Sequence, residues 1–177
     1  MGPKGRSAGK QSNKPAGEHS ELSHRVWIDY AEEKYGIRLA QQECEVELRP
    51  LVTTQSEIER VKYELVLHDG YRTDEPILVY RGRLGLSYIV DGHTRARVRW
   101  DLGERGIQAI LLTARNVELD GEFARIAEAT GGGTARRIWE VPITDRLGID
   151  SAAWHKRRGD LLRALEKQSG SKGKRTP

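Results

Sequence analysis

The middle of the chain constrains the fold most, because short apolar runs there alternate with one helical segment. Residues 76–80 and 87–90 are apolar runs of strand length, and the turn-forming residues 81–85 between them predict an antiparallel hairpin. After this hairpin an Asp-Gly pair leads into a helix that we expect to end near Leu102. A further buried strand is predicted at 107–112.

The flanking sequence adds helices and another strand. Residues 44–48 alternate apolar and acidic side chains, which is typical of a strand. Ser56 and Glu59 have the spacing of a capping box, which predicts a helix that begins there. Ser151 is a suitable N-cap for a last helix. In all we expect helices at 21–35, 56–67, 119–129 and from 152 onward, and an extended segment at 138–143.

Both ends of the chain are rich in Lys, Gly, Ser and Pro. Segments of that composition bury too little apolar surface to offset the entropy of ordering, so we expect disordered basic tails at 1–20 and 167–177. Basic tails attract polyanions such as DNA without reading a base sequence. Their basic residues are Lys4, Arg6, Lys10 and Lys14 in the first tail, and Lys167, Lys172, Lys174 and Arg175 in the last.

The sequence excludes several classes of protein. It has no run of about 18 apolar residues, so neither a membrane span nor a membrane partner is expected. The basic N-terminus lacks the apolar segment of a secretory signal. Cys44 is the only cysteine, which excludes an intramolecular disulfide and metal sites built from several cysteines. We therefore expect a cytoplasmic protein and assign no residue as a metal ligand.

The junction between the second strand and the following helix carries the best candidate site. Gly92 lets a ligand approach the main chain, and the next backbone amides point out of a helix N-terminus, which binds phosphate well. Thr94 adds a hydroxyl, and the guanidinium of Arg95 can contact two phosphate oxygens. His93 can donate a hydrogen bond or move a proton. Asp91 is negative, which suits a helix cap, a group that orients His93, a contact to a metal-bound phosphate, or a residue that acts on a hydroxyl.

This junction resembles the signature of the ParB N-terminal domain, from the ParB/sulfiredoxin (ParB/Srx) superfamily that also includes free serine kinases. The resemblance covers about residues 45–113 and implies an α+β (mixed α/β) fold, in which helices flank a small mixed sheet. We expect an N-terminal helix at 21–42, a ParB/Srx-like core at 43–115 and a helical C-terminal extension at 116–166, between the two tails. The matching residues are Pro76 to Val79, Tyr88 to Arg95, Leu102 with Gly103, and Ile107 to Leu112.

Three activities of this superfamily can be compared with these residues. Sulfiredoxins carry a catalytic cysteine in the loop that corresponds to residues 92–95, where this chain has no thiol. ParB proteins bind a nucleoside triphosphate at that loop and clamp DNA, which implies a nucleotide (ATP, ADP or CTP), Mg²⁺ and a homodimer. Free serine kinases phosphorylate a hydroxyl, for which Glu57 is the candidate base and Asp91 would position the hydroxyl.

The function that we expect is a ParB-like nucleotide-binding domain associated with DNA. Two alternatives stay open: a free serine kinase, and a basic DNA-binding module without nucleotide. Catalysis would make the chain a nucleotide-dependent phosphotransferase or NTPase. The candidate catalytic residues are Asp91, His93 and Glu57, and the candidate phosphate ligands are Gly92, His93, Thr94 and Arg95. Candidate DNA contacts are Lys156, Arg157 and Arg158 on the last helix, which could equally be a solvated face of a helix that docks Trp154 on the core.

Overall fold

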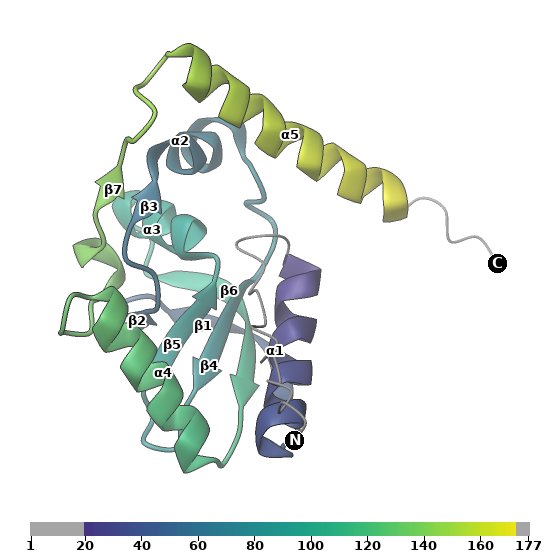
Figure 1. The fold of residues 1–177 in the computed structure, drawn as a ribbon, viewed down its shortest axis with the longest axis vertical. Helices are drawn as coiled ribbons and strands as arrows, with labels where there is room; N and C mark the ends of the chain where they lie inside the picture. Colours follow the sequence, from purple (N-terminus) through teal and green to yellow (C-terminus); the bar gives the residue numbers. More distant parts are fainter. Residues whose placement is uncertain (1–19, 173–177) are drawn as a thin grey trace, which may run out of the picture.

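The computed structural model describes residues 20–172, and the predicted basic tails lie largely outside these residues. A five-stranded mixed sheet forms the centre (Figure 1), with the strand order β1-β6-β4-β5-β2. The pairs β1–β6 and β4–β5 are antiparallel, whereas β6–β4 and β5–β2 are parallel. The strands are β1 (Ala40–Glu47), β2 (Val52–Thr53), β4 (Ile77–Arg81), β5 (Ser87–Asp91) and β6 (Gly106–Thr113).

Helices cover both faces of this sheet (Figure 1), which confirms the α+β fold class. Alternate side chains of β4 point to opposite faces, as the pleat of a strand requires. Ile77 and Val79 join the core beneath α2 (Arg60–Asp69) and α3 (His93–Asp101). Leu78 and Tyr80 join a second core beneath α1 (Ser20–Tyr35) and α4 (Val117–Thr130).

Two local expectations are wrong. The capping box at Ser56 does not form, because Ile58–Glu59 is a short strand, β3, and α2 begins only at Arg60. Only part of the segment 138–143 is extended: residues Ile138–Glu140 form a 3₁₀ turn, η1, before β7 (Ile143–Thr144). β3 and β7 pair in parallel. Pairing between segments so far apart in the chain is not visible in local sequence patterns.

The last helix, α5 (Ala152–Lys172), lies against α2 on the outside of the molecule (Figure 1). Its predicted cap is confirmed, since the backbone N–H of Trp154 donates to Ser151 Oγ at 3.1 Å. The helix continues past residue 167, where we expected a tail to begin. Among the described residues, no helix is both long and apolar enough to cross a membrane.

Candidate functional site

Gly92 shapes the junction between β5 and α3. Its φ of +90° lies in the left-handed region that side chains disfavour. A Cβ atom at this position would lie 2.5 Å from Ile77 Cγ2 and 2.9 Å from Arg95 Nη2. The first intrahelical hydrogen bond runs from the Ala96 N–H to the Gly92 carbonyl at 3.0 Å. The position therefore requires glycine for both its backbone angles and its space, and the first amides of α3 point away from the helix.

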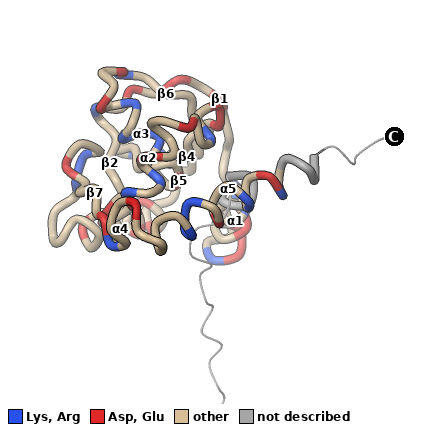
Figure 2. Tube along the Cα trace, turned by 90° about the horizontal axis from the view of Figure 1, so that it is seen from above, with Lys and Arg blue, Asp and Glu red and all other residues tan. Residues whose placement is uncertain are grey.

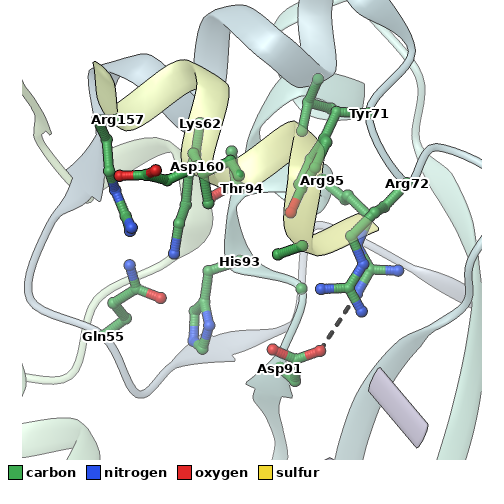
Figure 3. A pocket seen from close by; sticks show the side chains of 14 residues that line it. Gln55, Lys62, Tyr71, Arg72, Asp91, His93, Thr94, Arg95, Arg157 and Asp160 are labelled. Atoms are coloured by element: carbon green, nitrogen blue, oxygen red, sulfur yellow. Dashed lines mark hydrogen bonds and ion pairs between the residues drawn. The ribbon is translucent and has the colours of Figure 1, made fainter. Parts of the chain in front are cut away.

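A pocket of about 210 Å³ opens at this N-terminus (Figure 3), and we call it the α3 pocket. Its walls come from the β5–α3 junction, from α2 and the loop after it, and from α5. Four basic and two acidic side chains line it, and two further carboxylates, Glu59 and Glu75, pair with three of the basic ones from outside the lining. The charged residues are Lys62, Arg72, Arg95, Arg157, Asp91 and Asp160, and the other polar side chains are Gln55, Tyr71, His93 and Thr94.

Arg95 lies beneath the α3 pocket and is only 6% exposed. Its Nη1 donates to the carbonyls of Glu75 (2.5 Å) and Pro76 (3.0 Å), and its Nη2 donates to Asp91 Oδ2 at 3.3 Å. Burial lowers the pKa of the guanidinium, and Asp91 opposes this effect. Arg95 thus ties α3 to the segment before β4. It contributes positive charge under the pocket, while donors on both terminal nitrogens already have partners within the protein.

His93 is also buried, at 5% exposure. The backbone N–H of Thr54 donates to its Nε2 at 3.1 Å, and the Thr54 hydroxyl donates to the Ile89 carbonyl at 2.6 Å. Burial lowers the pKa of His93 to about 4, against an opposing effect of Asp91. The imidazole is therefore neutral near pH 7 and holds the segment after β2 against α3. In this arrangement it positions the pocket wall.

Asp91 and Thr94 are the accessible polar residues of the predicted motif. The Asp91 carboxylate is 36% exposed and contacts Arg95 through one oxygen. Thr94 is half-buried and lies on the first turn of α3. Both line the α3 pocket, so a ligand there would meet one carboxylate and one hydroxyl beside the helix amides.

Two further cations reach the α3 pocket from other elements. Lys62 comes from α2, and Arg157 comes from α5. Glu59 of β3 holds both: its carboxylate accepts two hydrogen bonds from Arg157, at 2.8 and 3.1 Å, and lies 3.8 Å from Lys62 Nζ. We expected Arg157 at a DNA interface and did not single out Lys62. Only the packing of α5 on α2 brings the two together.

Arg72 is a third cation that the sequence did not reveal. It has a φ of +55°, which is uncommon for a residue with a side chain and marks local strain. Its guanidinium pairs with Glu75 at 2.6 Å and is 15% exposed. Strained residues gather at ligand sites. Only the backbone conformation of Arg72 indicates that it belongs to a candidate site, and no sequence pattern does.

The other predicted site residues lie elsewhere. Glu57 lines a neighbouring pocket, where Arg146 donates two hydrogen bonds of 2.8 Å to its carboxylate. This pairing lowers the pKa of Glu57. Arg158 pairs with Asp69 at 2.8 Å, and Lys156 is exposed. After the three consecutive basic residues 156–158, acidic and basic residues alternate along α5 only as far as Lys167.

The donors of the α3 pocket fit phosphate oxygens: two cationic side chains at its mouth, a hydroxyl and a helix N-terminus. Among the described residues, no group of three or more His, Cys, Asp or Glu side chains is arranged to hold a metal ion. Mg²⁺ commonly binds through one or two carboxylates together with substrate phosphates. Asp91 fits that role alongside a bound phosphate.

No family model and no curated protein matches the sequence. The structure is similar to that of the protein Atu1540 from Agrobacterium tumefaciens, with 14% identity and a TM-score of 0.39 over 60% of this chain and 63% of the other. It is also similar to a Pnob8-like ParB-N domain, with 14% identity and a TM-score of 0.34 over 78% of this chain and 51% of the other. The chain thus spans less than two thirds of either protein. At this identity the likeness is one of fold alone.

Proposed function

We propose that this chain binds the phosphate groups of a nucleotide in the α3 pocket. The observation that carries the proposal is the convergence of four basic side chains on one helix N-terminus, against two acidic ones. A helix N-terminus alone is weakly selective for anions. Cations from α2, from the loop after it and from α5 make this one a compact anion site.

The exposure of each residue that lines the α3 pocket would decide how it acts on the phosphates. Lys62 is 33% exposed and Arg157 is 40% exposed, so they would contact the phosphates directly from the mouth of the pocket. Thr94 and the first amides of α3 would donate from its floor. Arg95 and Arg72 would act from beneath through their charge, because their guanidinium groups are largely enclosed. Asp91 would hold Mg²⁺, which would offset the negative charge of the phosphates.

A second candidate function is phosphotransfer to a small hydroxyl compound, and the exposure of Asp91 favours it. A general base must lie within hydrogen-bond reach of the hydroxyl that it deprotonates. Asp91 reaches the α3 pocket, whereas Glu57 is held by Arg146 outside its lining. Incubation with L-serine, Mg²⁺ and ATP, ADP or CTP, followed by mass spectrometry for O-phosphoserine, tests this function. Product that disappears in Asp91→Ala would establish it.

Binding itself is tested with a matched pair of lysines. Lys62 lines the α3 pocket, and Lys156 is exposed on α5 away from it. Calorimetric titration with Mg²⁺–ATP and Mg²⁺–CTP should show affinity about tenfold weaker in Lys62→Ala, which loses a charged phosphate contact. Lys156→Ala should bind as the wild type does. Absence of nucleotide binding by the wild type, or equal losses in both variants, would refute the proposal.

A further inference from the structure

We infer that the pocket beside the α3 pocket is the subsite for the nucleoside, with Glu57 as the residue that recognises its ribose hydroxyls. We call it the β3 pocket, because β3 and the segment that follows β7 form its walls. The inference rests on the proposed function, since it assigns the part of the ligand that the α3 pocket leaves unbound.

The two pockets adjoin one another. Gln55 and Lys62 line both of them, so together they form a shared wall. The side chain of Gln55 is held in place, because its Nε2 donates to the Glu57 carbonyl at 2.5 Å. Figure 3 shows Gln55 and Lys62 at the side of the α3 pocket away from Asp91. A ligand with its phosphates at α3 can therefore extend past these two side chains.

The pocket volumes are in keeping with such an extension. Pockets for small organic ligands usually measure about 300–1,000 Å³. The α3 pocket has about 210 Å³ and the β3 pocket about 300 Å³. The first volume lies below the usual range for small organic ligands, and the two together lie within it.

A nucleotide has charged phosphates and an uncharged nucleoside, and the linings of the two pockets differ in charge in the same way. The α3 pocket has an excess of basic side chains, whereas three acidic and three basic side chains line the β3 pocket and balance. Its lining also includes apolar side chains, among them Val61 and Trp154, which are 1% and 5% exposed. A balanced pocket with an apolar lining suits an uncharged group.

The carboxylate of Glu57 is oriented so that it can accept hydrogen bonds from an uncharged group in the β3 pocket. Arg146 holds both carboxylate oxygens, each at 2.8 Å, and the carboxylate remains 34% exposed. Arg146 and Thr144 keep the pKa of Glu57 below its usual value, so the group stays ionised. Each oxygen retains lone pairs beyond its bond to Arg146. An oriented carboxylate of this kind binds the vicinal hydroxyls of a ribose, as acidic residues do at dinucleotide sites.

The test compares three ligands, each with Mg²⁺: ATP, 2′,3′-dideoxy-ATP and inorganic tripolyphosphate. Glu57→Gln should weaken ATP binding about tenfold, the usual effect of losing one charge-assisted hydrogen bond. It should leave the affinities for dideoxy-ATP and tripolyphosphate unchanged. Glu33→Gln, at an exposed position on α1, is the control. Arg146→Gln is a second variant, which leaves Glu57 in place but releases its orientation, and it should show a smaller loss confined to ATP.

The outcomes separate the two proposals. If Glu57→Gln weakens all three ligands equally, or none, the β3 pocket is not the nucleoside subsite although the phosphate site stands. Equal binding of ATP and dideoxy-ATP by the wild type would also overturn the inference. If the wild type binds neither ATP nor tripolyphosphate, the proposed function fails and the inference fails with it.

Discussion

His93 shows how a residue of the candidate site also holds that site together. Its Nε2 accepts the Thr54 N–H, and its ring is shielded from solvent. This contact joins the residue that follows β2 to the first turn of α3, and His93 itself lines the α3 pocket. The burial that makes His93 a good anchor also keeps it neutral.

The buried imidazole predicts a pH dependence of stability. Its pKa falls from an ordinary value near 6.5 to about 4 on folding, so between these values the unfolded chain binds a proton that the folded chain does not. The stabilisation is complete above pH 6.5 and is lost as the pH falls toward 4, by on the order of 3 kcal/mol. Urea unfolding at several pH values should show this loss, and His93→Gln should reduce its slope. His155→Gln, at an exposed position, should keep the wild-type slope.

Gly92 can be tested against a matched glycine. Gly92→Ala introduces both an unfavourable φ and a clash with Ile77, so we expect the free energy of unfolding to fall by about 3 kcal/mol or more. Gly103 has a similar φ of +85°, but a Cβ atom added there would meet no other atom within 4 Å. Gly103→Ala should therefore cost only about 1–2 kcal/mol. Chemical denaturation of both variants measures the difference, and equal costs would show that the contact with Ile77 is unimportant.

At the scale of elements, α5 completes the site. Trp154 and Leu161 of this helix pack on Val61 and Leu65 of α2. That contact places Arg157 at the mouth of the α3 pocket, where Glu59 fixes its guanidinium. The charge around the α3 pocket thus depends on a helix that follows the central sheet in the chain and that touches the rest of the molecule chiefly through α2.

Trp154→Ala should release α5 from α2. The side chain is 5% exposed, and truncation of a buried aromatic ring removes about 3–5 kcal/mol of packing. Hydrogen exchange should then become faster across α5, while β4 and β6 keep their protection, and nucleotide affinity should fall because Arg157 is no longer held in place. His155→Ala, at the adjacent exposed position, is the control. Unchanged exchange in α5 would show that other contacts hold the helix.

At the scale of the whole molecule, positive charge is concentrated at the ends of the sequence. Six of the 30 Lys and Arg residues and one of the 26 Asp and Glu residues lie outside residues 20–172, so this stretch has 24 basic and 25 acidic residues. Figure 2 shows the two signs mixed over the fold. The net charge of +4 therefore comes from the ends, and they are the better candidates for contact with a polyanion.

A truncation tests this distribution. The full chain should bind a DNA duplex weakly, with an affinity that falls as salt rises. A chain of residues 20–172 lacks six basic residues, and it should bind DNA more weakly and with a shallower dependence on salt. Nucleotide binding should be the same in both, because no residue of the α3 pocket is removed. Equal DNA affinity of the two proteins at every salt concentration would place the contact on the folded part.

The sequence by itself determined the features that depend on neighbouring residues. Apolar runs and turn residues predicted the β4–β5 hairpin, and its antiparallel pairing is confirmed. Gly92 predicted a sharp entry into α3, because only a few residues along the chain decide that geometry. The Asp91–Arg95 segment was identified as the candidate site because its five residues are consecutive in the sequence. The structure places all five of them in the lining of one pocket.

Only the tertiary structure decided which other residues surround that segment. Lys62, Arg72 and Arg157 reach the α3 pocket from separate parts of the chain, and no local pattern relates them. Glu57 is turned to the β3 pocket by Arg146, 89 positions away, and the strand β3 forms because β7 pairs with it. Periodicity and capping report contacts within a few residues, whereas these partners meet through packing between distant elements. The sequence therefore located the turn that we propose binds phosphate, and the packing of α2 and α5 decided which charges surround it.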